Sequence, residues 1–109
     1  MTNYQPGDLI LVDFPFAGGT QTKTRPALVI LDTGDADLVV ARVTTQPVSA
    51  ALDVPITDWQ GAGLLAASIV RLPKLATIEK SLVHRVLGSL QPADRTQVSA
   101  VMQQVFGNW

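Results

Sequence analysis

The sequence has no cysteine and a single histidine, His84. A chain without cysteine forms no disulfide and no thiolate metal site. One histidine and scattered carboxylates also lack the spacing that is typical of zinc or calcium centres. No apolar run approaches the roughly 20 residues that span a bilayer, and residues 1–8 lack the basic and apolar regions of a signal peptide. These absences predict a cytoplasmic protein that uses no metal or other cofactor and does not enter a membrane.

Charge is also scarce, and its two signs are unevenly placed along the chain. Charged residues make up 16% of the sequence and the net charge is −1, so there is no overall attraction to nucleic acid. The first 54 residues carry a charge of −3 and the rest carry +2. Four basic residues, Arg71, Lys74, Lys80 and Arg85, lie close in sequence and are opposed only by Glu79. Two interpretations stay open: a local basic surface for an RNA backbone, or scattered charge that keeps the chain soluble.

Length and apolar content indicate one β-rich domain that spans residues 1–109. The chain has 109 residues, of which 47% are hydrophobic, which is enough for a core without cross-links. Apolar, β-prone segments bounded by glycine and proline predict strands. These segments are residues 8–14, 25–31, 38–45, 53–58, 68–72, 75–78 and 83–87. Residues 79–84 could instead form a short helix.

The last segment changes from a strand period to a helix period. Its apolar residues Val98, Val101, Met102 and Val105 recur at the spacing of one helix face. Proline at position 92 suits a first helical turn, and glycine at position 107 suits the exit. Many short strands followed by one helix predict a mainly β fold, a small and strongly bent antiparallel barrel with a C-terminal helix.

Side-chain alternation divides residues 38–45 into two faces. The face that begins with Val39 and ends with Thr45 is the more apolar one, and we expect it in the core. Arg42 and Thr44 fall on the other face, where we expect them to be directed toward solvent or a groove.

The most informative segment is a polar loop followed directly by Arg25 and Pro26. The loop Gly18-Gly-Thr-Gln-Thr-Lys-Thr24 offers hydroxyls, backbone amides and an ammonium group, all of which bind phosphate. Pro26 disfavours the α region for Arg25 and holds it extended at the start of a buried strand. The alternatives are that the glycines only form a turn and that Arg25 is an ordinary surface residue. The candidate RNA-binding residues of this segment are Thr20, Gln21, Thr22, Lys23 and Thr24.

RNA cleavage is a chemistry that these residue types can support. RNA supplies its own nucleophile, the 2′-hydroxyl, so an enzyme need only align that oxygen with phosphorus, assist proton movement and stabilise the anionic transition state. Arginine and hydroxyl donors suit the last task, and Arg25 and Thr44 are such groups. A Ser-His-Asp triad built on His84 would be a coincidence, because no nucleophile elbow accompanies it.

Ordered sequence blocks resemble the MazF/PemK toxins of bacterial type II toxin–antitoxin systems. The blocks are Pro6-Gly-Asp-Leu-Ile-Leu-Val-Asp-Phe-Pro15 with Arg25-Pro-Ala-Leu-Val-Ile30, then Val43-Thr-Thr-Gln46, then Ser68-Ile-Val-Arg-Leu72 with Ala76-Thr-Ile-Glu-Lys80, and finally Val86-Leu-Gly-Ser-Leu90 with the last helix. Each block alone has little specificity, but together they cover nearly the whole chain in the family's order. One departure is Ala76, where several relatives have a basic residue.

The resemblance implies an SH3-like β-barrel that forms a homodimer. It also implies a metal-independent endoribonuclease that cleaves single-stranded RNA and leaves 2′,3′-cyclic phosphate and 5′-hydroxyl ends. The catalytic roles carry over to Arg25 and Thr44, and the RNA-binding set extends to Gln46, with Arg71 or Lys74 in place of the basic residue missing at position 76. Because a guanidinium rarely gives up its proton, we expect Arg25 to stabilise charge before it acts as an acid or a base.

The same resemblance implies a cognate antitoxin whose disordered segment folds across the basic groove. Two other functions stay open on the sequence alone. The gyrase poison CcdB shares this barrel, so a protein-directed toxin is one alternative. A non-catalytic barrel that binds RNA or a peptide is the other.

Overall fold

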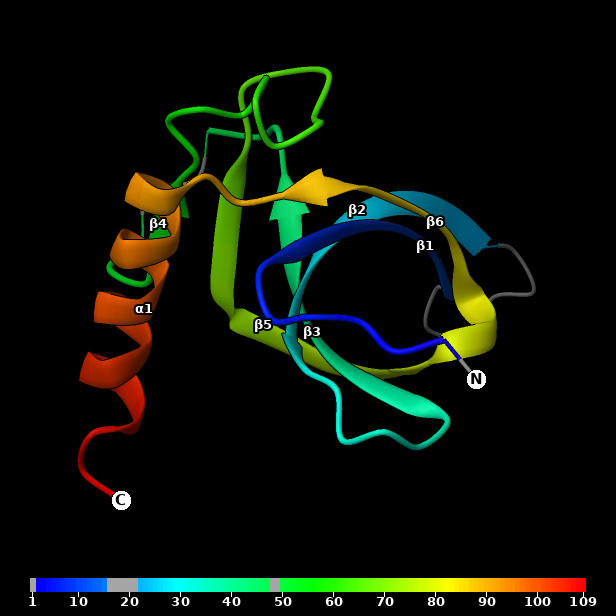
Figure 1. Ribbon diagram of the computed structural model, residues 1–109. Coiled ribbons are helices and arrows are strands. Elements are labelled where there is room, and N and C mark those ends of the chain that lie inside the picture. Colours follow the sequence, from blue (N-terminus) through cyan, green and yellow to red (C-terminus); the bar gives the residue numbers. More distant parts are fainter. Residues whose placement is uncertain (1, 16–21, 48–49) are drawn as a thin grey trace.

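The structure is a computed structural model that describes residues 2–15, 22–47 and 50–109, with only the backbone of Pro15 and Thr22. These residues form one antiparallel sheet with the strand order β4-β5-β3-β2-β1-β6 and a C-terminal helix (Figure 1). The strands are β1 (Asp8–Pro15), β2 (Thr22–Leu31), β3 (Asp37–Thr44), β4 (Asp53–Pro55), β5 (Ile69–Glu79) and β6 (Val83–Ser89), and the helices are the short 3₁₀ helix η1 (Lys80–Leu82) and α1 (Pro92–Phe106).

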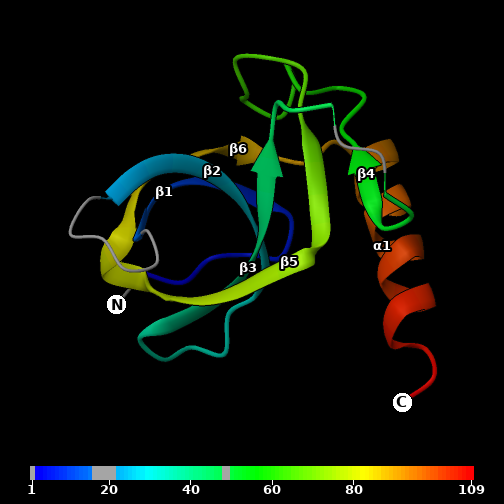
Figure 2. The same cartoon turned by 180° about the vertical axis from the view of Figure 1, so that it is seen from behind.

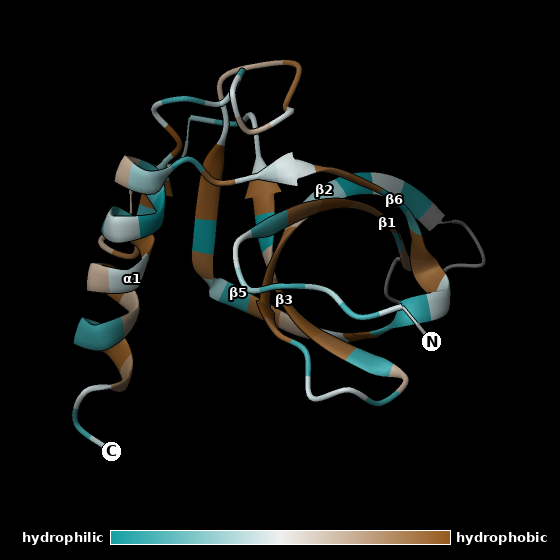
Figure 3. Cartoon of the chain, viewed as in Figure 1, coloured by the Kyte–Doolittle hydropathy of each residue, from teal (hydrophilic) through white to brown (hydrophobic). Residues whose placement is uncertain are grey.

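The sheet curls so strongly that it buries side chains on both faces. One cluster fills the inside of the curl and includes Ile10, Val12 and Val40. The second cluster includes Leu28 of β2 and Val98 of α1, so it lies between the other face of the sheet and the helix. The strands carry long hydrophobic stretches (Figure 3). The predicted mainly β fold with a C-terminal helix is confirmed, although the ladder among the described residues leaves β4 and β6 as edges and does not close.

Strand β5 joins two segments that the sequence separates at Pro73. Its pairing with β3 runs from Glu79 back to Leu75 opposite Ala41, and then resumes with Arg71 opposite Arg42. Residues 72–74 are therefore skipped by the ladder, and Pro73, which has no backbone N–H, falls in the gap. The predicted break between 72 and 75 was wrong because a bulge lets one strand continue through the proline.

Strand β3 differs from the expectation of one buried and one open face. Leu38 and Val40, which share the parity of Arg42, are 1% and 0% exposed because that face turns into the curl. Only the last part of the face is open, since Arg42 is exposed and Thr44 half-buried. Burial of Thr45 was also predicted wrongly: β3 ends at Thr44 and Thr45 is exposed in the following bend.

Helix α1 packs beside β4 and β5, as both views show (Figures 1 and 2). It begins at Pro92 and ends before Gly107, as the sequence predicts. The buried carboxylate of Asp94 in its first turn accepts hydrogen bonds from the backbone N–H groups of Thr57 and Asp58, each at 2.9 Å. This contact fixes the turns that follow β4 to the start of the helix. No helix in the described part of the chain is long and apolar enough to cross a membrane.

Candidate functional site

A pocket of about 380 Å³ lies where β2, β3 and β5 present polar side chains. Three of its residues are arginines from three different strands: Arg25 of β2, Arg42 of β3 and Arg71 of β5. The described lining contains no carboxylate and no imidazole, so the pocket is positively charged. The described residues that line it are Phe14, Arg25, Pro26, Arg42, Val43, Thr44, Thr45, Gln46, Ser68 and Arg71.

Arg25 and Thr44 reach the pocket from neighbouring strands. The antiparallel register of β2 and β3 pairs Ala27 with Arg42. Arg25 and Thr44 each lie two residues from that pair, so they share a face and the same end of their strands. Both side chains line the pocket, which is the arrangement that a shared site of Arg25 and Thr44 requires.

The hydroxyl of Thr44 is held in place by the bend that follows it. Its Oγ1 accepts a hydrogen bond from the backbone N–H of Gln46 at 3.1 Å. Because that contact uses only a lone pair of the oxygen, the hydroxyl proton stays available to donate. Thr44 therefore offers a fixed hydrogen-bond donor, next to an exposed guanidinium at Arg25.

Arg42 was not among the candidate residues, although strand parity places it on the same face as Thr44. Its guanidinium carbon lies 5.4 Å from the centroid of the Phe14 ring, which is within cation–π distance. Arg42 is also the cross-strand partner of Arg71 on β5. The signal that could have found it is the alternation of residues 42 and 44, combined with a positive charge on a strand that is otherwise apolar.

The other predicted RNA-binding residues fall into three groups. Gln46 and Arg71 line the pocket together with Arg25 and Thr44. Lys74 lines an adjoining pocket of about 330 Å³ that shares Phe14 and Arg42 with the first. Lys23 is exposed on β2 opposite Phe14, outside the lining of either pocket.

The described residues cover only part of the threonine-rich loop. Thr20 and Gln21 lie outside the described residues, and so does the side chain of Thr22. Thr24 donates its hydroxyl to Oδ1 of Asp13 at 2.8 Å, and it alternates with Arg25 along β2, so its hydroxyl is engaged away from the pocket. The RNA contacts predicted for these residues stay predictions.

His84 lies on β6 and pairs with the other oxygen of Asp13, with Nε2 at 2.8 Å from Oδ2. This hydrogen bond, together with that from Thr24, lowers the pKa of Asp13 below its ordinary value. His84 is not part of the described pocket lining, so the geometry gives it a structural contact with the strand that carries Phe14.

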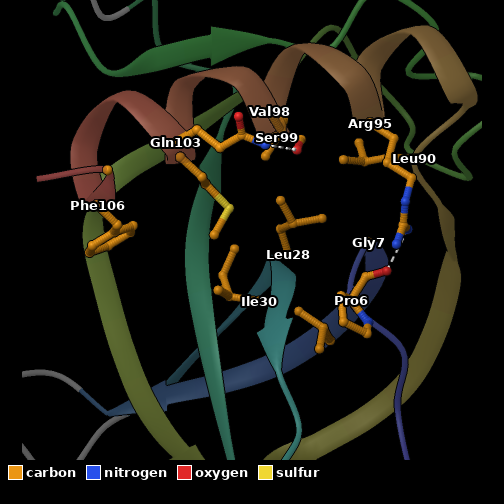
Figure 4. Close-up of a pocket in the computed structure, with 13 residues that line it drawn as sticks. Pro6, Gly7, Leu28, Ile30, Leu90, Arg95, Val98, Ser99, Gln103 and Phe106 are labelled. Carbon is orange, nitrogen blue, oxygen red and sulfur yellow. Dashed lines mark hydrogen bonds between the residues drawn. The ribbon is translucent and has the colours of Figure 1, made fainter. Parts of the chain in front are cut away.

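A second pocket, of about 700 Å³, lies between α1 and β2 (Figure 4). Leu28 and Ile30 face Val98 and Phe106 across it, and Arg95, the one cation among its described lining residues, donates to the backbone carbonyl of Pro6. The larger pocket is thus mainly apolar, and the guanidinium of Arg95 is engaged by the backbone. The smaller pocket has the chemistry that a phosphate needs, and the described residues include no group of three or more possible metal ligands.

Comparisons with solved structures agree with this fold. An endoribonuclease from Mycobacterial species in complex with its cognate antitoxin superposes with a TM-score of 0.75 at 19% identity and covers 96% of each chain. A MazE–MazF complex from Deinococcus radiodurans gives a TM-score of 0.75 at 19% identity and covers 95% of this chain and 96% of the other. No curated protein matches the chain. The profile of the family described as PemK-like, MazF-like toxin of type II toxin-antitoxin system matches residues 5–106, and the chain therefore belongs to that toxin family.

Proposed function

We propose that this toxin is a metal-independent endoribonuclease that cleaves single-stranded RNA in the three-arginine pocket. The observation that carries the proposal is the convergence of Arg25, Arg42 and Arg71 on one pocket together with the Thr44 hydroxyl. A polyanion is the substrate class that such a pocket favours. This charge favours RNA over the protein target of the CcdB-like alternative. The solved structures named above as an endoribonuclease and as MazF support the same activity.

The proposed reaction is an in-line displacement at phosphorus. The 2′-oxygen forms a bond to phosphorus and the bond to the 5′-oxygen breaks, which gives a 2′,3′-cyclic phosphate and a 5′-hydroxyl. The 2′-oxygen loses a proton and the 5′-oxygen gains one, so the atoms balance. Arg25 and the hydroxyl of Thr44 stabilise the charge that develops on the non-bridging oxygens. Arg25 acts as a cation, because a guanidinium rarely gives up its proton.

The test uses a long single-stranded RNA incubated in EDTA with the wild-type protein or with Arg25→Ala. The wild type is expected to cleave and to leave 5′-hydroxyl ends, which accept phosphate from polynucleotide kinase without prior phosphatase treatment. The Arg25 variant is expected to be slower by a factor of about 10³ or more, since it loses its main charge-stabilising donor. Equal cleavage by both proteins would point to a contaminating nuclease. Activity that EDTA abolishes would exclude the metal-independent mechanism.

The proposed protein partners are an antitoxin and a second copy of the chain. The proposed location is the cytoplasm, where the RNA substrate resides. Two of the similar solved structures are toxin–antitoxin complexes, which supports the first partner. An acidic, disordered antitoxin segment would bind the three arginines and exclude RNA. Co-expression with the small protein encoded beside the toxin gene should suppress toxicity and give a complex on purification, and light scattering measures whether the free toxin is a dimer.

A further inference from the structure

A carboxylate, that of Asp53, lies beside the proposed RNA pocket and contacts one of its arginines without lining the pocket. Asp53 on β4 is the direct cross-strand partner of Arg71 on β5, and Arg71 is in turn the partner of Arg42 on β3. The three residues therefore form one row across three strands, with side chains on one face. Within that row Asp53 is the only negative charge.

The contact between Asp53 and Arg71 has an unusual form. Oδ1 of Asp53 accepts from Nε of Arg71 at 3.4 Å, which is a long hydrogen bond. The Asp53 side chain is only 3% exposed, and its second oxygen, Oδ2, has no hydrogen-bond partner among the described residues. Burial of a carboxylate with so little compensation costs stability. A residue retained at such a cost is a candidate for a functional role rather than for a structural one.

The geometry of the guanidinium indicates what that role is. Since Asp53 contacts Nε, the terminal Nη1 and Nη2 groups of Arg71 are not needed for the ion pair. Arg71 is 27% exposed and lines the pocket, whereas Asp53 does not. A guanidinium held at Nε presents its two terminal nitrogens as a planar fork, the arrangement that binds phosphate through two parallel hydrogen bonds.

We infer that Asp53 is a positioning residue that orients Arg71 to bind an RNA phosphate in the pocket. Without Asp53, the guanidinium would face Arg42 across the strand pair with no counter-charge, and like charges directly opposite repel each other. Asp53 therefore acts through Arg71 and does not itself touch RNA. The inference rests on the proposed function, because the ligand of the fork is the RNA backbone.

The sign of the effect distinguishes this role from simple electrostatics. Asp53→Asn removes a negative charge beside a basic pocket, so uniform electrostatics predicts tighter binding of RNA. If Asp53 positions Arg71, the same substitution weakens binding, because the fork loses its orientation. Asp37→Asn is the matched control: Asp37 is exposed on β3, at the end of the strand away from Thr44, and its loss changes the net charge by the same amount.

The experiment measures binding by fluorescence anisotropy as a function of salt. The probe is a mixed-sequence single-stranded oligonucleotide with 2′-O-methyl groups throughout, which lacks the nucleophile and is not cleaved. We expect Asp53→Asn to weaken binding about fivefold and Asp37→Asn to leave it unchanged or slightly tighter. The slope of log K against log salt is negative. It should become less negative by up to about 0.7 for Asp53→Asn, as for Arg71→Ala. The double variant should bind no more weakly than Arg71→Ala alone.

Each outcome bears on a different claim. If the wild type does not bind the probe, the proposed function fails. If the wild type binds and Asp53→Asn binds as well or better, the positioning role is wrong. A loss confined to oligonucleotides that contain guanine would overturn the phosphate assignment, because the fork would then read a base edge. Arg71→Lys keeps the charge without the fork and is expected to match Asp53→Asn, so the conclusion does not depend on one variant; thermal unfolding checks that all of them fold.

Discussion

The hydroxyl of Thr44 provides the sharpest test of the proposed catalytic site. Thr44→Val keeps the size and the β-branched shape of the side chain and removes only the polar atom. The bond lost in the folded protein is the one from the Gln46 N–H at 3.1 Å, at a bend where Gln46 is exposed and water can replace it. We therefore expect unfolding free energy to fall by only about 0.5–1 kcal/mol.

The expected effect of Thr44→Val on catalysis is much larger. A fixed donor to the charged oxygens of the transition state contributes about 3–4 kcal/mol, so kcat should fall by a factor of about 10²–10³. Single-turnover cleavage of RNA measures this fall, and chemical denaturation measures stability in parallel. Thr44→Ser restores the hydroxyl and should recover most of the rate. The reasoning would be refuted if Thr44→Val cleaved at the wild-type rate, or if its loss of activity matched a comparable loss of folded protein.

Four further substitutions test the fold that supports the site. Asp94→Ala leaves the N–H groups of Thr57 and Asp58 without their carboxylate, so we expect a loss of about 3 kcal/mol and a fall in Tm of more than about 10 °C in calorimetry. The pKa of Asp32 is lowered to about 2, first by the N–H of Tyr4 and then by Lys80 and Gly34. Its stabilising contribution is therefore complete above the ordinary pKa and disappears as pH falls from about 4 to about 2; denaturation of Asp32→Asn and wild type should differ at pH 7 and converge at pH 2. Gly63 has φ +91 and a Cβ there would overlap the carbonyl oxygen of Leu87, so Gly63→Ala should cost at least about 2 kcal/mol, whereas Gly34→Ala, with φ +90 and open space, should cost about 1 kcal/mol from backbone strain alone.

Much of the fold follows from local pattern. Apolar, β-prone stretches bounded by glycine and proline predict β1 and β2, and the period of 3.6 predicts α1, because these signals lie within each segment. Strand parity also places Thr44 on the open face, before any tertiary contact is known. Arg25 follows from the proline beside it and from the family blocks.

The features that sequence reasoning missed depend on contacts between distant segments. Pro73 lies inside β5 because the bulge opposite Ala41 and Arg42 excludes it from the ladder, and a single strand does not show its partner's bulge. The same is true of Asp53, which meets Arg71 across 18 positions of sequence. Thr45 escapes burial because β3 ends one residue earlier than its pattern suggests.

The strand order has a consequence for when the toxin becomes harmful. The pocket takes Arg25 from the early part of the chain and Arg71 from the late part, with β3 between them in the sheet. The cluster behind this part of the sheet needs Val98, Val101 and Met102 of α1, close to the end of the described chain. A partly synthesised chain has neither the full set of arginines nor the core that holds them, and pairings this distant in sequence form late in folding. Nearly all of the described chain must therefore be made and folded before the pocket is complete, and an antitoxin made alongside would meet this surface as soon as it forms.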